Sequence, residues 1–223
     1  MRAVPHPAAA ALLCLLGAPA AALDTAWPRL EAPPTARVSR VADDIVLNGK
    51  RSRVSRFEVH ASEAEVLQFY RRRFAPGRVV ENRINGSPVI ATREGDHFHT
   101  VQLRAIDGGS VQATVITTAL HDVPPSAAAI DTERLLPADT AIVTTLQSDD
   151  AGRRSLLVVG LNRHSLQANR EHLATALQQR GFRLIGGDAL SFSFASPAEQ
   201  AEVTLSDAGS HRSVLIHRTK ELR

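Results

Sequence analysis

A pattern of strand, capped helix and strand occurs twice in this chain, about a hundred residues apart. The first copy starts at residues 57–74, FEVHASEAEVLQFYRRRF, and the second covers residues 158–182. In each copy an apolar strand runs into a serine, and a serine at that place can accept a hydrogen bond from the first turn of a helix. Because the second copy follows the order of the first, the sequence predicts an internal duplication.

The first helix has the clearer signature of the two. Ser62 and Glu65 form an S-x-x-E capping box, in which the serine oxygen accepts a bond from the third helical amide and the glutamate accepts one from the cap amide. In the second copy Ser165 holds the cap position and Gly181 follows the last turn. Residues at helical spacing predict one apolar face for the first helix: Val66, Phe69, Tyr70 and Phe74.

Around each helix, apolar stretches alternate with turn residues. Asn48-Gly49 and Asn85-Gly86 are typical of tight hairpin turns, and turns are also expected around Asp43-Asp44 and near Gly108 and Gly209. We therefore expect an α+β fold of two tandem β-β-α-β-β-β-β repeats, each a mostly antiparallel sheet packed on one helix. A single repeat buries only a modest core, so the two either pack together or share a sheet.

Composition sets the boundaries of these parts. Residues 23–35 contain three prolines and are predicted to form an extended lead-in. The first repeat is expected over residues 36–120 and the second over residues 136–223. Between them, residues 121–135 begin with His-Asp-Val-Pro-Pro and have the composition of a linker.

The N-terminus has the features of a secretory signal. Met1-Arg2 precedes an apolar run over residues 8–22 that ends in small residues, which predicts a signal peptide over residues 1–22 with cleavage after Ala22. The run is shorter than the about 20 residues of a membrane span, and we expect no transmembrane anchor. Cys14 could instead carry a lipid, but the apolar run continues past it, which favours simple cleavage. We expect a periplasmic or secreted protein.

Several chemistries are excluded by what the chain lacks. Cys14 is the only cysteine, so removal of the signal leaves no disulfide, thiolate metal site or cysteine nucleophile. No serine lies in a G-x-S-x-G motif, and Gly109-Ser110 and Gly209-Ser210 fall in expected hairpin turns. No glycine-rich loop opens a helix to hold a phosphate. We expect no cofactor, and these absences favour a non-catalytic protein over an enzyme.

The histidine pair His97-x-His99 is the one candidate metal site. Alternate residues of a strand point to the same face, so both imidazoles could bind one metal ion. The other interpretation is a half-exposed pair on an edge strand. A site would need more ligands, which could come from His60, His121 or Asp122.

Arginines give a second candidate surface. Arg56, Arg71 and Arg72 could form a patch for an acidic polymer or anionic lipid headgroups. The alternative is that Arg71 and Arg72 are the solvated side of the helix. The formal net charge is only +3, and the aromatic residues are expected in the core, so we expect no binding to nucleic acid.

These features favour an exported, non-catalytic protein. We expect a periplasmic binding or accessory module of a cell-envelope assembly or secretion system, with an envelope protein as its partner. The alternative is a metal-binding protein or metal-dependent hydrolase that uses His97 and His99. A carrier of a small ligand or lipid, with a pocket between the repeats, is a third possibility. The sequence leaves the oligomeric state open.

Overall fold

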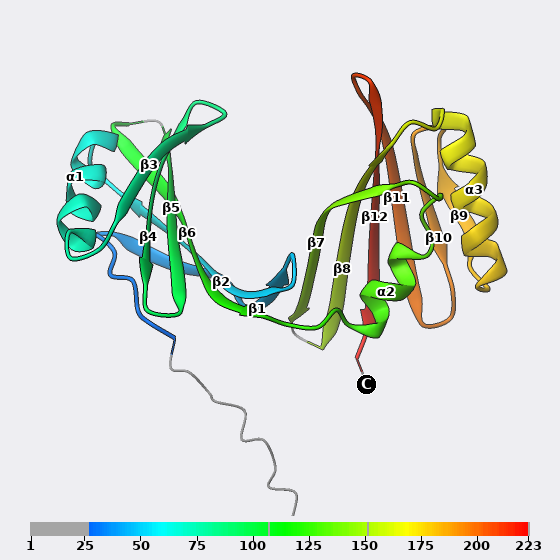
Figure 1. The fold of residues 1–223 in the computed structure, drawn as a ribbon, viewed down its shortest axis with the longest axis horizontal. Coiled ribbons are helices and arrows are strands. Elements are labelled where there is room, and N and C mark those ends of the chain that lie inside the picture. The colour runs from blue at the N-terminus through cyan, green and yellow to red at the C-terminus, as the bar shows by residue number, and fades with distance from the viewer. Residues whose placement is uncertain (1–26, 107, 151, 223) are drawn as a thin grey trace, which may run out of the picture.

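All twelve strands of the part that is described lie in one antiparallel sheet, in the order β3-β4-β5-β6-β2-β1-β7-β8-β12-β11-β10-β9 (Figure 1). The computed structural model describes residues 27–106, 108–150 and 152–222. The predicted signal peptide, including Cys14, lies outside these residues.

The elements follow the chain in two similar sets. The first set is β1 (Arg37–Leu47), β2 (Lys50–Val59), α1 (Glu63–Phe74), β3 (Val79–Ile84), β4 (Ser87–Glu94), β5 (His97–Ile106) and β6 (Ser110–Asp122). The second is α2 (Ala127–Glu133), β7 (Ala141–Asp150), β8 (Arg153–Asn162), α3 (Leu166–Gln179), β9 (Arg183–Gly187), β10 (Ser191–Ala195), β11 (Glu199–Ala208) and β12 (His211–Glu221). We call these the first half and the second half.

The two halves share the sheet because β1 pairs with β7. Three ladder pairs form this seam, Ile45 with Ser148, Val46 with Gln147 and Leu47 with Leu146, and Asn48 extends it with a backbone bond and a side-chain bond to Thr145. The predicted fold class of two tandem β-β-α-β-β-β-β repeats, each a mostly antiparallel sheet packed on one helix, is therefore wrong, because the described strands form a single sheet. The pairing satisfies backbone donors and acceptors that would otherwise stay free at the edges of two smaller sheets.

The second half repeats the pairing of the first in the opposite order along the sheet. β2 lies between β1 and β6, and β8 lies between β7 and β12 in the same way. In Figure 1 the halves rise from the seam like the arms of a V, with α1 at the outer left and α3 at the outer right. The duplicated order of elements thus gives an arrangement with approximate twofold symmetry.

Each half has its own hydrophobic core between its helices and the sheet. In the first half, Tyr70 is fully buried and its hydroxyl donates to the Glu31 carbonyl at 3.1 Å, which ties the lead-in to the core. In the second half, Leu173 and Leu177 of α3 and Leu135 after α2 are fully buried in one cluster. The segment predicted as a linker therefore contains a short helix that belongs to the second core.

The predicted caps and the predicted Asn-Gly turns are confirmed, but one predicted turn is wrong. Ser62 accepts the Glu65 amide at 3.3 Å, and the Glu65 carboxylate accepts the Ser62 amide at 2.8 Å. Asn48 and Gly49 have positive φ values of 49° and 75°, as a tight hairpin requires. The turn predicted at Asp43-Asp44 is wrong, because these residues lie within β1, where the register shifts at bulges.

The three helices lie on one face of the sheet, and the other face carries no helix among the described residues. Gln147 at the seam points to the helical face, where Ser126 donates to it next to α2. We call the opposite surface the open face. Its neighbouring apolar side chains cross the seam, and most of them are half-buried: Ile45, Leu47, Val54, Leu146, Leu157 and Leu215.

Candidate functional site

The two histidines of the predicted metal site lie on β5 in the first half, on the helical face. His99 is fully buried, with Nδ1 at 3.0 Å from Thr117 Oγ1 and Nε2 at 3.4 Å from a carboxylate oxygen of Glu94. His97 packs against the indole of Trp27, with the ring centroids 5.2 Å apart. Burial lowers the pKa of His99, although the Glu94 charge opposes this shift. His99 is therefore a neutral core residue at neutral pH.

The three residues predicted as further metal ligands contact other side chains instead. His60 Nδ1 is 3.3 Å from Ser110 Oγ, His121 contacts Asp96 at 3.6 Å, and Asp122 pairs with Lys50 at 2.8 Å. In the part of the chain that is described, no three His, Cys, Asp or Glu side chains are grouped to hold a metal ion. Metal binding at His97 and His99 stays a prediction.

The three arginines of the predicted patch are divided between the two sides of the sheet. Arg71 on α1 is held by Glu81 through two bonds of 2.6 and 2.7 Å, and Arg72 is exposed on the same helix. Arg56 neighbours Phe57, which packs against α1, and strand alternation therefore turns Arg56 to the open face. The structure brings Arg71 and Arg72 together, but not Arg56.

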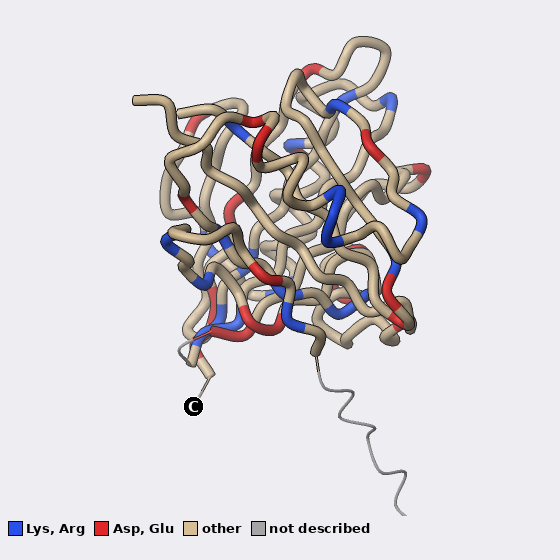
Figure 2. Tube along the Cα trace, turned by 90° about the vertical axis from the view of Figure 1, so that its left-hand side faces the viewer, with Lys and Arg blue, Asp and Glu red and all other residues tan. Residues whose placement is uncertain are grey.

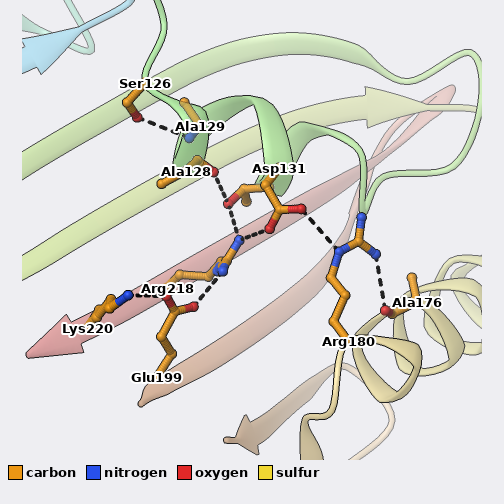
Figure 3. Close-up of polar contacts among 10 residues, drawn as sticks. Ser126, Ala128, Ala129, Asp131, Ala176, Arg180, Glu199, Arg218 and Lys220 are labelled. Atoms are coloured by element: carbon orange, nitrogen blue, oxygen red, sulfur yellow. Dashed lines mark hydrogen bonds and ion pairs between the residues drawn. The ribbon is translucent and has the colours of Figure 1, made fainter.

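The most buried charged cluster lies on the helical face of the second half (Figure 3). Arg218 of β12 is 12% exposed and donates to Asp131, at 2.8 Å, and to Glu199. Arg180 also contacts Asp131, at 3.3 Å. Desolvation alone would raise the pKa of Asp131, but the bonds from Arg218 and Arg180 hold it below its ordinary value. Lys220 lies 3.8 Å from Glu199 and adds a third cation, and the cluster joins α2 and α3 to the sheet.

On the open face of the second half, three polar side chains from neighbouring strands form a connected row. Ser155 Oγ on β8 lies 2.8 Å from Nε2 of His217 on β12. The Nδ1 atom of the same imidazole lies 3.6 Å from a carboxylate oxygen of Glu202 on β11. We call these three residues the Ser155 row. Imidazole between a hydroxyl and a carboxylate is the arrangement that activates serine nucleophiles.

Two open hollows flank this row. One, of about 430 Å³, is lined by Glu202, His217 and Thr219 together with the hairpin between β10 and β11. The other, of about 530 Å³, is lined by Ser148 and Ser155. Arg153 and Glu221 line both hollows, so the two are adjacent beside the row. A ligand on the open face could contact all three polar side chains.

The first half has the same framework without this chemistry. Ser52 pairs with Thr118 across β2 and β6, and this pair is equivalent to Ser155 and Thr219 on β8 and β12. On β6, the residue equivalent to His217 of β12 is Ile116. Thr100 lies opposite Ile116 as Glu202 lies opposite His217. Ser52 is fully buried and lies 3.0 Å from Thr118 Oγ1. The row is thus a feature of the second half alone.

Sequence reasoning missed the Ser155 row because its members come from three strands and fit no local motif. One signal was present in the duplication. When the two copies are aligned by their strands, a histidine and a glutamate replace an isoleucine and a threonine on the same face.

Comparisons with known proteins give no relative. No protein-family model matches this chain, and no curated protein is similar to it in sequence.

Within the described residues, none of the helices has the length and apolar character needed to cross a membrane. Functional inference therefore depends on the geometry of the sheet.

Proposed function

We propose that the protein is an exported binding module that contacts another protein of the cell envelope through the open face of its sheet. The observation that carries this proposal is the one-sided covering of the sheet. The three helices of the described residues pack on one face, while half-buried apolar residues of both halves, Leu47 of the first and Leu157 and Leu215 of the second among them, lie on the other. A half-buried apolar stripe that crosses the seam is typical of a contact surface.

The charges of the open face favour a protein as the partner. Arg56 and Glu58 on β2 and Arg153 and Glu202 in the second half give both signs on this surface. Figure 2 shows basic and acidic residues interspersed along the chain rather than gathered by sign. Phosphate polymers and anionic lipid surfaces select for one sign of charge, whereas protein interfaces combine apolar centres with mixed charges.

The open face is large enough for a stable contact. Neighbouring strands lie about 4.8 Å apart, so twelve strands give a face more than about 50 Å wide. A specific protein interface uses about 800 Å² on each partner, which part of such a face can supply.

Affinity capture from envelope extracts tests the proposal. The mature protein is used as bait, the captured protein is identified by mass spectrometry, and its binding is remeasured with both components purified. We expect Leu157→Asp on the open face to weaken binding at least tenfold. The matched control is Leu184→Asp on β9, an exposed leucine at the far edge of the sheet. Binding that survives Leu157→Asp, or no reproducible partner, would contradict the proposal.

Export is tested separately by N-terminal sequencing of the protein recovered from the periplasm. Cleavage after Ala22 predicts a chain that begins at Leu23. A lipid-modified chain that begins at Cys14 would support the alternative.

The alternative of a metal protein keeps one observation in its favour. Nε2 of His99 is buried and makes no hydrogen bond within the described residues, although the Glu94 carboxylate lies 3.4 Å from it. Equilibrium dialysis with zinc and copper, compared between the natural protein and His97→Ala/His99→Ala, tests this function. Retention of metal that the double substitution abolishes would support it.

A further inference from the structure

We propose that Ser155 is a nucleophile toward carboxylic esters, with His217 as its general base and Glu202 as a positioning residue. This step goes beyond the binding role proposed above and replaces the expectation of a non-catalytic protein.

The row has the connections that serine activation needs. At 2.8 Å, His217 Nε2 is within range to take the proton of the Ser155 hydroxyl. Glu202 lies on the opposite side of the ring, 3.6 Å from Nδ1, where its negative charge stabilises the imidazolium that forms. His217 is 34% exposed and Ser155 is half-buried, so a substrate can reach both.

The charge that develops on the substrate oxygen needs hydrogen-bond donors. Backbone amides of a central strand are used in the sheet, so side chains must supply these donors. Ser155 lies directly between Ser148 on β7 and Thr219 on β12, and residues paired across strands point to the same face. Their two hydroxyls flank the nucleophile. Arg153 lies two residues before Ser155 on the same face of β8, and it lines both hollows.

The surroundings of the row indicate the class of ester. Leu157 lies directly opposite His217, and Leu215 precedes His217 on the same face. An apolar acyl chain can lie over these two leucines. The alcohol side of the ester would then occupy the polar hollows. We therefore infer a preference for esters with a short apolar acyl group.

The reaction balances with water as the only co-reactant. Ser155 Oγ attacks the ester carbonyl carbon while its proton passes to His217 Nε2. The bond from the carbonyl carbon to the alcohol oxygen breaks, and the leaving oxygen takes the proton from His217. Water then attacks the acyl carbon of the acyl-serine, again with its proton going to His217. The bond from the acyl carbon to Ser155 Oγ breaks, Oγ takes the proton back from His217, and the carboxylic acid is released.

The first half excludes a purely structural reason for the row. The same ladder positions are filled by Ser52, Ile116 and Thr100, and that half builds its sheet without imidazole or carboxylate there. The fold therefore does not need His217 or Glu202 on the open face. Their presence in one half only indicates a chemical use.

The test uses the full mature protein, a fluorophosphonate probe that labels activated serines, and p-nitrophenyl butyrate as the substrate. We expect the probe to label Ser155, as located by peptide mass mapping, and Ser155→Ala to abolish both labelling and esterase activity. His217→Gln is expected to lower the hydrolysis rate about 100-fold, and Glu202→Gln to lower it less. The butyrate ester should react faster than the acetate ester.

Ser213→Ala is the matched control, because Ser213 lies on the same face of β12 and outside the row. It should leave labelling and hydrolysis unchanged. Hydrolysis that persists in Ser155→Ala, or labelling of Ser155 that persists in His217→Gln, would overturn the proposal. Far-UV circular dichroism of each variant separates lost chemistry from lost folding.

Discussion

The two halves of the sheet share their framework but differ in the polar groups built on it. At equivalent ladder positions of β6 and β12 stand Thr117 and Arg218. In the first half Thr117 contacts the buried, uncharged His99. In the second half Arg218 holds two carboxylates, and the residue opposite it on the neighbouring strand is Ala201 in place of His99.

This difference shows which parts of a duplicated fold are free to diverge. The positions that pack on the helices are apolar in both halves. For example, Val101 and Val203 occupy equivalent strands and are both fully buried. Polar positions can be exchanged as long as each buried group has a partner. The open face, which the helices do not cover, is under still weaker constraint and carries the largest contrast, between Ile116 and His217.

The largest expected effect comes from separating the halves. Each half has its own core, and the seam is short, with three ladder pairs and the bonds between Asn48 and Thr145. We expect residues 123–223, which include α2, to fold alone with cooperative unfolding in urea and an m value roughly half that of the full chain, because m scales with the surface exposed. A fragment that unfolds without cooperativity would show that the seam is needed for folding.

Within the second half, loss of the Arg218 charge should have the next largest effect. Arg218→Met leaves Glu199, 19% exposed, and Asp131 without their main cation. Breaking a buried ion pair from one side costs several kcal/mol, and we expect a loss of about 3 kcal/mol in the free energy of unfolding. Denaturant unfolding measures it.

Arg154→Met is the matched control for this substitution. Arg154 makes a bidentate pair with Asp149 on the same strand hairpin, but the two side chains are 37% and 43% exposed. Solvent screens such a pair, and we expect a loss below about 1 kcal/mol. Equal losses in the two variants would refute the distinction between the buried cluster and the surface pair.

In the first half, the buried histidine predicts a dependence of stability on pH. The pKa of His99 is lowered in the folded state by burial, so the unfolded chain binds this proton first as the pH falls below the ordinary value of 6.5. Stability should then decrease with falling pH and return as the pH rises. Urea unfolding at several pH values should show a flatter profile for His99→Leu/Thr117→Val, which removes both partners of the bond. An unchanged profile would contradict a neutral His99.

Local sequence patterns predicted the local structure well. The Ser62 capping box and the Asn48-Gly49 turn depend on neighbours within a few residues, and both are confirmed. Helix α2 was missed because seven residues, opened by Ser126 after two prolines, are too short to show an apolar face.

Pairing over long distances could not be predicted in the same way. The seam joins residues about a hundred positions apart, and no turn or spacing in the sequence fixes its register. The Ser155 row also depends on pairing between strands that are distant in the sequence. Ser155 and His217 are 62 positions apart and meet only because β8 and β12 are neighbours in the sheet.

The smallest expected contrast between the halves concerns the helix caps. Ser62 takes part in a reciprocal capping box, whereas Ser165 accepts the Ala168 amide at 3.0 Å and has no glutamate at the third position to return a bond. Ser62→Ala should therefore cost about 1 kcal/mol and Ser165→Ala somewhat less, since one backbone amide loses its acceptor in the second case and the box is broken in the first. Chemical denaturation of the two variants and of Glu65→Ala resolves the difference. If Glu65→Ala is neutral, the two caps are equivalent and the halves differ only in their polar clusters and on the open face.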